Sequence, residues 1–139
     1  MLYLADYFAV ISTKIECKEG DSNSTVRPAV SLRVPSEDNP DHPFPEGIEL
    51  FALPNGWNIE SKWRQPLFHT TQCTKLDGSP YYAAFFTFFT NSGDDKFEPI
   101  SLILIARHIH IRQLKNALIL CYDKHILGQL RQSNSNLVN

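Results

Sequence analysis

The histidines are the residues of this chain that most readily suggest a chemistry. There are five, and His108 and His110 stand two positions apart after an apolar run. In a strand, two residues at this spacing lie on one face, as two ligands of a metal ion would. A third ligand would have to come from His42, His69, His125 or the Asp94–Asp95 pair, all remote in sequence. Because no second His or Cys pair has a metal-ligand spacing, we expect a polar rim where strand becomes helix, and neither metal nor cofactor.

Nucleophilic and acid–base chemistry has little support in the sequence. Cys73 falls in a predicted strand and Cys121 on the apolar side of a predicted helix, so both are expected in the core. A cluster of carboxylates (Asp38, Asp41, Glu46 and Glu49) is typical of a solvated face. The chain also has no Gly-x-Ser-x-Gly elbow, phosphate-binding loop, dinucleotide glycine pattern or His-Glu-x-x-His helix. We therefore expect no catalytic residue.

One segment has the composition of a partner-binding surface. The turn tripeptide Pro54-Asn55-Gly56 is followed by Trp57, a large anchor expected to cover the end of a sheet. Soon afterwards, Lys62, Trp63 and Arg64 combine an aromatic ring with two cations. Such residues are enriched in protein interfaces. The alternative is that Trp63 packs over a sheet edge while the two cations extend into water, and the sequence leaves both open.

Short apolar runs predict the strands that would position these residues. They are residues 7–11, 48–53, 67–76, 81–89 and 100–105, while 30–34 could be a strand or a helical turn. Asp77-Gly78 separates two of the runs and predicts a hairpin. Residues 81–89 are almost wholly apolar, which is typical of a central strand covered on both faces. The polar stretch 14–27 predicts a loop.

A helix is predicted from Ile111 onward. Its apolar side would carry Ile111, Leu114, Ala117, Leu118, Cys121 and Tyr122, and its polar side Arg112, Lys115, Asn116 and Asp123. Gly128 is the expected end of the helix. The expected organisation is a domain at 1–127 and a mobile polar tail at 128–139. The predicted fold class is α+β, with a mostly antiparallel sheet and a C-terminal helix packed on one face.

Composition narrows the class of partner and the compartment. The length of 139 residues suits one domain, and 42% hydrophobic residues indicate a globular chain. A formal net charge of −2 gives no reason to expect nucleic acid or an anionic membrane surface as partner. Three widely spaced cysteines do not suggest a disulfide framework. With no secretory signal and no apolar run of membrane-spanning length, a cytoplasmic protein is expected.

Four stretches carry a family resemblance. They are Leu4–Ile11, Arg33-Val34-Pro35, the run Phe44-Pro45-Glu46-Gly47-Ile48-Glu49-Leu50-Phe51, and Phe97–Arg107. In this order and spacing, residues from about Leu4 to about Ile126 resemble the upstream segment of DENN domains, the modules of exchange factors for Rab GTPases. The motifs Ala5-Asp6-Tyr7-Phe8 and Gly47-Ile48-Glu49-Leu50-Phe51 are most similar to those of the myotubularin-related pseudophosphatases of the SET-binding-factor type.

The resemblance implies a longin-like module that acts in membrane traffic. Its partners would be a Rab GTPase and the core and downstream DENN segments, in cis or in trans, with peripheral association to endomembranes through partners. Exchange of this kind needs no nucleophile, because the factor binds the nucleotide-free conformation best. Candidate contacts are Lys62, Trp63, Arg64, Arg112 and Lys115. Since the family would continue beyond the first helix, we expect the chain to be no enzyme by itself. A non-catalytic longin-like scaffolding module is the alternative.

Overall fold

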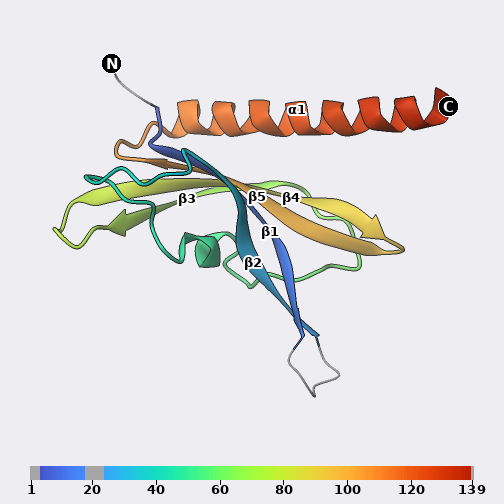
Figure 1. Cartoon of the computed structure of the whole chain (residues 1–139), viewed down its shortest axis with the longest axis horizontal. Helices are drawn as coiled ribbons and strands as arrows, with labels where there is room; N and C mark the ends of the chain where they lie inside the picture. Colours follow the sequence, from blue (N-terminus) through green and yellow to red (C-terminus); the bar gives the residue numbers. More distant parts are fainter. Residues whose placement is uncertain (1–3, 18–23, 139) are drawn as a thin grey trace.

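The computed structural model describes residues 4–17 and 24–138, which form one antiparallel sheet and one long helix (Figure 1). The elements in chain order are β1 (Tyr7–Cys17), β2 (Ser24–Val34), the short 3-10 helix η1 (Ile48–Phe51), β3 (Leu67–Thr74), β4 (Pro80–Gly93), β5 (Lys96–Ala106) and α1 (Ile111–Val138). The strand order is β2-β1-β5-β4-β3, and every neighbouring pair is antiparallel. The predicted α+β class is confirmed.

The centre of the sheet is formed by β4 and β5. Residues 83–89 of β4 are all buried, as are 101–106 of β5, so the aromatic run is a central strand covered on both faces, as predicted. The hairpin at Asp77-Gly78 is also confirmed. Gly78 has a φ of 90°, a backbone conformation that residues with a Cβ rarely adopt.

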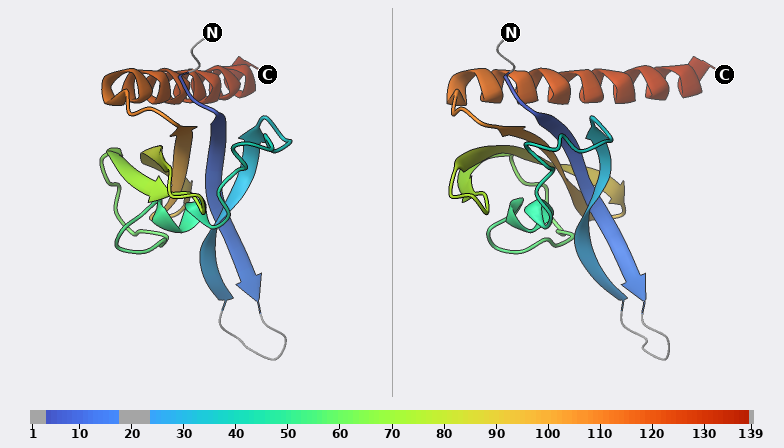
Figure 2. Two further views of the ribbon diagram at one scale, coloured as in Figure 1. Left: turned by 90° about the vertical axis from the view of Figure 1, so that its left-hand side faces the viewer. Right: turned by 60° about the vertical axis from the view of Figure 1, so that its left-hand side comes forward.

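Each face of the sheet has its own apolar core. On one face, which we call the α1 face, Leu114 and Leu118 pack with Phe86, Phe88 and other residues of β4 and β5. The opposite face, the η1 face, is covered by the segment between β2 and β3, and its core includes Ile48, Ala52 and Trp57. Figure 2 shows α1 and η1 on opposite sides of the sheet. Trp57 is therefore the sheet anchor that the sequence predicted.

The sequence predicted a strand at residues 48–53. The structure instead has η1 there. Gly47 precedes η1 with a φ of 82°, and the backbone N–H of Leu50 donates to the Gly47 carbonyl at 3.1 Å. A left-handed glycine followed by a turn cannot continue an extended chain. Ile48 points into the core, whereas Leu50 and Phe51 are 69% and 55% exposed.

The first two strands extend further than the sequence indicated. The pairing of β1 with β2 runs from Phe8 opposite Val34 to Cys17 opposite Ser24, so most of the predicted loop 14–27 is strand, and 30–34 is strand rather than helical turn. Alternating Lys, Glu and Arg with Ile and Val suits two strands with one solvated face. Residues 18–23, which also belong to the predicted loop, lie outside those described.

The helix begins at the predicted residue but ends later than predicted. It continues through Gly128 to Val138, so a helix end at Gly128 is wrong; one glycine costs a helix only about 1 kcal/mol. Leu114 and Leu118 are fully buried, but Ile111 is 48% exposed and Cys121 is also exposed. The apolar side is therefore narrower than predicted. The division of the chain at 127 stays a prediction.

Candidate functional site: surfaces and a pocket around the sheet

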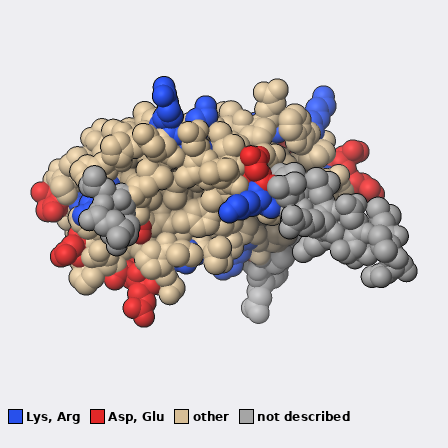
Figure 3. Space-filling model, turned by 90° about the horizontal axis from the view of Figure 1, so that it is seen from above, with Lys and Arg blue, Asp and Glu red and all other residues tan. Residues whose placement is uncertain are grey.

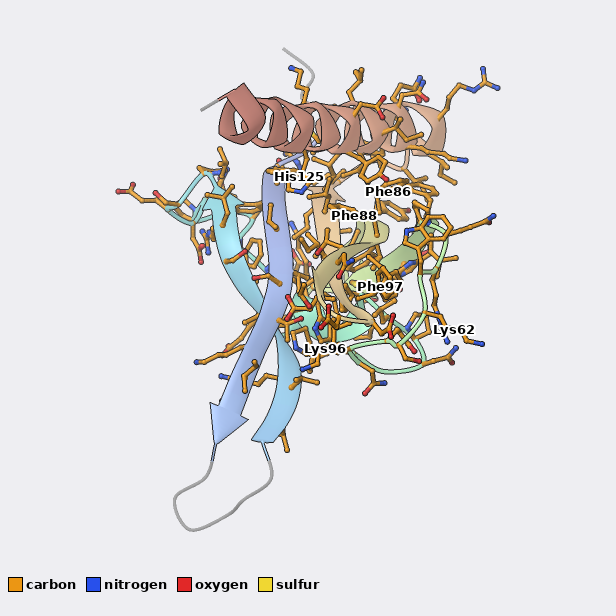
Figure 4. All side chains as sticks on the ribbon, turned by 90° about the vertical axis from the view of Figure 1, so that its right-hand side faces the viewer. Lys62, Phe86, Phe88, Lys96, Phe97 and His125 are labelled. Atoms are coloured by element: carbon orange, nitrogen blue, oxygen red, sulfur yellow. The ribbon has the colours of Figure 1, made fainter. Side chains whose placement is uncertain are left out.

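The segment with Lys62, Trp63 and Arg64 lies on the surface between η1 and β3. It is attached to the sheet by Glu60 and Phe97, whose backbone groups exchange two hydrogen bonds of 2.9 and 2.8 Å. Arg64 also forms an ion pair with Glu60 at 3.5 Å. Trp63 is 57% exposed, so its ring does not pack closely over a sheet edge. Figure 4 shows Lys62 extending outward from this segment.

The helix residues Arg112 and Lys115 are both exposed and three positions apart, so they lie on one side of α1. The Lys115 ammonium lies 5.5 Å from the centre of the Phe68 ring in β3. Phe68 is the second residue of β3, so Lys115 contacts the strand that follows the Lys62–Arg64 segment. Seen from the α1 side, Lys and Arg are scattered among uncharged residues (Figure 3).

Two groups of exposed apolar side chains lie beside these surfaces. The first, here the β2 patch, consists of Leu32 and Val34, which are 53% and 55% exposed and stand directly opposite Val10 and Phe8. These four residues share the α1 face: Phe8 and Val10 are half-buried against the core under α1, whereas Leu32 and Val34 on the edge strand stay exposed.

The second group, here the η1 patch, consists of Leu50, Phe51 and Leu67, all more than half exposed. The ring Nε2 of His69 lies 3.0 Å from the Phe51 carbonyl oxygen, and His69 stacks on Phe85. Because Leu67 and His69 are two apart in β3, they point to the same face. The end of η1 and the start of β3 therefore form one apolar edge.

The histidines and cysteines are dispersed. His108 and His110 lie in the turn between β5 and α1, with ring centres 6.3 Å apart, and not on a shared strand face. Within residues 4–17 and 24–138, no group of three or more His, Cys, Asp or Glu could hold a metal ion. His125 is part of α1, and its ring centre lies 5.5 Å from that of Phe88 in the sheet below (Figure 4). Cys73 is half-buried against the η1-face core.

A pocket of about 670 Å³ opens where the start of β1, the end of β5 and the β3–β4 turn meet. His42 is at its centre, and two cations approach this imidazole. The Lys75 ammonium lies against His42 Nδ1, and Arg107 Nη1 lies 3.1 Å from His42 Nε2. Arg107 is itself oriented by Asp6, with its Nε and Nη2 each 3.2 Å from a carboxylate oxygen.

The backbone that carries His42 is fixed by Tyr7. The Tyr7 hydroxyl donates to the His42 carbonyl at 2.6 Å and accepts from the Asn39 N–H at 2.8 Å. Tyr7 is buried and its ring meets Phe44 edge-on, with centroids 5.3 Å apart. Lys75 is held in turn by the backbone hydrogen bond from its N–H to Ser79 at 2.9 Å. Hydrogen bonds and an aromatic contact therefore position the backbone around the pocket.

Two side chains of the pocket have shifted pKa values. Burial, together with a hydrogen bond to Cys73 on the neighbouring strand, raises the pKa of Tyr81 to about 12. Hydrogen bonds from the Ser79 hydroxyl and N–H lower the pKa of Asp77 below its usual value. At neutral pH, Tyr81 is therefore a neutral donor, and Asp77 carries a negative charge.

The sequence did not predict this pocket. Asp6 and Arg107 are 101 residues apart and meet because β1 pairs with β5, with Tyr7 opposite Ile105. Only the strand pairing could have shown this, and the sequence contains no local signal for it. His42 was considered only as a remote metal ligand.

Comparison with known proteins gives a family match over part of the chain. No helix among the described residues is long and apolar enough to cross a membrane. No solved structure matches the chain. Residues 28–88, from β2 to β4, match the family model of the uDENN domain. The match supports an upstream DENN segment, the first part of the DENN module of Rab exchange factors in membrane traffic.

Proposed function

We propose that this chain is the upstream segment of the DENN module of a Rab guanine-nucleotide exchange factor, and that it is incomplete for exchange by itself. The observation that carries the proposal is the match of residues 28–88 to the uDENN domain. That stretch contains most of the η1-face cover, including Gly47, Ile48 and Trp57, together with the β3–β4 hairpin.

Exchange would proceed without covalent chemistry. A factor that binds the nucleotide-free GTPase more tightly than the nucleotide-bound form lowers nucleotide affinity by that difference. Such a protein needs a shaped surface and not a nucleophile or an acid–base pair. The exposed Trp63 with Lys62 and Arg64, and the cations Arg112 and Lys115 on α1, are our proposed contacts with the GTPase. Trp and Arg, which make up three of these five residues, are frequent in binding hot spots.

The proposed incompleteness is supported by the two apolar patches. Isolated exposed apolar residues are ordinary in a soluble protein, but contiguous groups mark a surface that another protein covers. The β2 patch consists of Leu32 and Val34, next to the half-buried Phe8 and Val10, and the η1 patch joins Leu50 and Phe51 to Leu67. We propose that the core and downstream DENN segments cover one or both patches, in cis or in trans.

Three finer assignments belong to the same proposal. The sequence motifs Ala5-Asp6-Tyr7-Phe8 and Gly47–Phe51 support a relationship to the SET-binding-factor type of myotubularin-related pseudophosphatase. The antiparallel sheet with α1 on one face is compatible with a longin-like module. A cytoplasmic protein that reaches endomembranes through its partners is the compartment that fits a Rab partner.

The test is to mix the purified chain with a panel of Rab proteins, nucleotide-free and GTP-loaded, and to follow both binding and release of fluorescent GDP. We expect preferential binding to at least one nucleotide-free Rab, with a GDP-release rate unchanged from that of the Rab alone. Trp63→Ala should weaken binding by about tenfold or more, as expected of a hot-spot aromatic. The control is Leu76→Ala, which removes an exposed apolar side chain just beyond the other end of β3.

Each other result has a defined meaning. Accelerated GDP release by the chain alone would contradict the proposed incompleteness. Binding that ignores the nucleotide state, or binding to no Rab, would contradict the exchange-factor assignment and favour a non-catalytic longin-like scaffolding module.

A further inference from the structure

The pocket around His42 shares no lining residue with the proposed Rab contacts. Its walls come from the start of β1, the segment 41–46, the β3–β4 turn and the end of β5. A volume of about 670 Å³ is within the range of sites that hold small ligands or a few peptide side chains. Apolar side chains, among them Phe44, Leu76 and Ile105, surround its polar centre.

The polar centre has more hydrogen-bond donors than acceptors. A neutral imidazole has one N–H and one lone pair, but both ring nitrogens of His42 face cationic donors, Lys75 and Arg107. Whichever tautomer is present, one cation therefore faces an N–H and lacks an acceptor there. Protonation of the ring would add a third cation and would not supply the acceptor. A carboxylate group has two oxygens, and each can accept from a different one of these donors.

The charges around this centre limit which anionic group can supply these oxygens. Asp6 is already paired with Arg107, and Asp77 accepts from Ser79. Asp41 and Glu46 also line the pocket, are exposed, and form no ion pair within the part of the chain that the structure describes. These carboxylates would repel a doubly charged phosphate group or a run of acidic residues. They would instead attract positive charge on a ligand.

We propose that this pocket binds a single carboxylate group, received between Lys75, His42 and Arg107 and accompanied in the ligand by positive charge that faces Asp41 and Glu46. The carboxylate could be that of a free organic acid or of a Glu or Asp side chain in a basic peptide. The apolar walls favour the peptide, since they would cover the aliphatic parts of neighbouring side chains.

The test compares four probes on the full chain: acetate, inorganic phosphate, the capped tripeptide Arg-Glu-Arg, and the capped tripeptide Arg-Gln-Arg, in which a neutral amide replaces the central carboxylate. Binding is followed by NMR through the ring signals of His42, which report at the site itself, and by calorimetry. We expect Arg-Glu-Arg to shift the His42 signals and to bind at least about tenfold more tightly than Arg-Gln-Arg, because a charge-assisted hydrogen bond is replaced by a neutral one. Inorganic phosphate should bind more weakly than Arg-Glu-Arg.

The variant Lys75→Met removes one cation from the pocket, and Lys96→Met removes one exposed cation from the start of β5, outside the pocket lining. We expect the first to weaken Arg-Glu-Arg binding by about fivefold or more and the second to leave it unchanged. Circular dichroism checks that each variant is folded. If Lys75→Met does not fold, the comparison of probes on the unaltered chain still tests the proposal.

The outcomes separate the two sources of the carboxylate. Shifts of the His42 signals with acetate as strong as with Arg-Glu-Arg would assign the site to free organic acids, and shifts with the peptide alone would assign it to peptides. Four results would overturn the proposal. Arg-Glu-Arg and Arg-Gln-Arg could bind with equal affinity, or the two lysine variants could lose Arg-Glu-Arg affinity equally. Phosphate could bind more tightly than Arg-Glu-Arg, or no probe could shift the His42 signals.

Discussion

The indole Nε1 of Trp57 donates a hydrogen bond to Thr13 Oγ1 at 3.0 Å, across 44 residues of sequence. Trp57 is 8% exposed and belongs to the η1-face core. This bond ties the turn that follows η1 to the middle of β1. It fixes the start of the segment that leads to Lys62, Trp63 and Arg64, so a single contact links the core of the domain to the proposed GTPase surface.

Replacement of Thr13 by Val should lower the free energy of unfolding by about 1–3 kcal/mol. Valine keeps the shape of threonine but leaves the buried Trp57 N–H without an acceptor. The measurement is chemical denaturation followed by tryptophan fluorescence. Thr74→Val at an exposed position of β3 is the control, and a similar loss there would show that the hydrogen bond is not the cause.

A pair of hydroxyls is buried in the sheet itself. Thr87 and Ser101 stand opposite each other in β4 and β5, both with 0% exposure, and their oxygens are 3.0 Å apart. Thr87→Val should lower the free energy of unfolding by about 1–3 kcal/mol, because it leaves the Ser101 hydroxyl unpaired. The double variant with Ser101→Ala should cost less than the sum of the two single variants. Strict additivity in this double-mutant cycle would contradict the pairing.

The β3–β4 turn depends on the left-handed conformation of Gly78. Its φ is 90° and a Cβ built there meets no atom within 4 Å, so the cost of a side chain is conformational and not steric crowding. Gly78→Ala should lower the free energy of unfolding by about 1 kcal/mol. Gly93 also has open space but no positive φ, so Gly93→Ala should be close to neutral. Equal effects of the two variants would exclude this explanation.

The ionisation of Tyr81 should make stability depend on pH in the alkaline range. Burial, with a contribution from Cys73, raises the pKa of Tyr81 from 10.0 to about 12. Below pH 10 the phenol is protonated in both the folded and the unfolded chain. Between these pH values the unfolded chain loses the proton first, so folding stability falls as pH rises. Tyr81→Phe should remove that part of the loss, as measured by denaturation at several alkaline pH values. An unchanged pH profile in this variant would contradict the raised pKa.

The sequence predicted the central elements of the fold well, because their signals are local. The aromatic run of β4, the turn at Asp77-Gly78 and the start of α1 at Ile111 each follow from residue pattern. Where a local signal had two meanings, the prediction was wrong. Ile48–Phe51 has a strand-like composition, but the left-handed Gly47 turns it into η1. Gly128 suggests a helix end, but one glycine does not outweigh continued helix formation on both sides.

The surfaces were less accessible to sequence reasoning. Trp63 could be predicted as exposed or packed, and the structure leaves it exposed. Ile111 and Cys121 have the spacing of core residues, yet both are exposed because the sheet beneath α1 covers only part of its circumference. The pocket depends on the pairing of β1 with β5, which joins the two ends of the sequence and has no local signature.

The most direct test of the central claim is the affinity of the chain for a Rab protein in its nucleotide-free and GTP-loaded states, measured on the same immobilised panel. An upstream DENN segment predicts tighter binding to the nucleotide-free form of at least one Rab, and a loss of that preference in Trp63→Ala but not in Leu76→Ala. Equal affinity for the two states across the whole panel, or no binding, would contradict it.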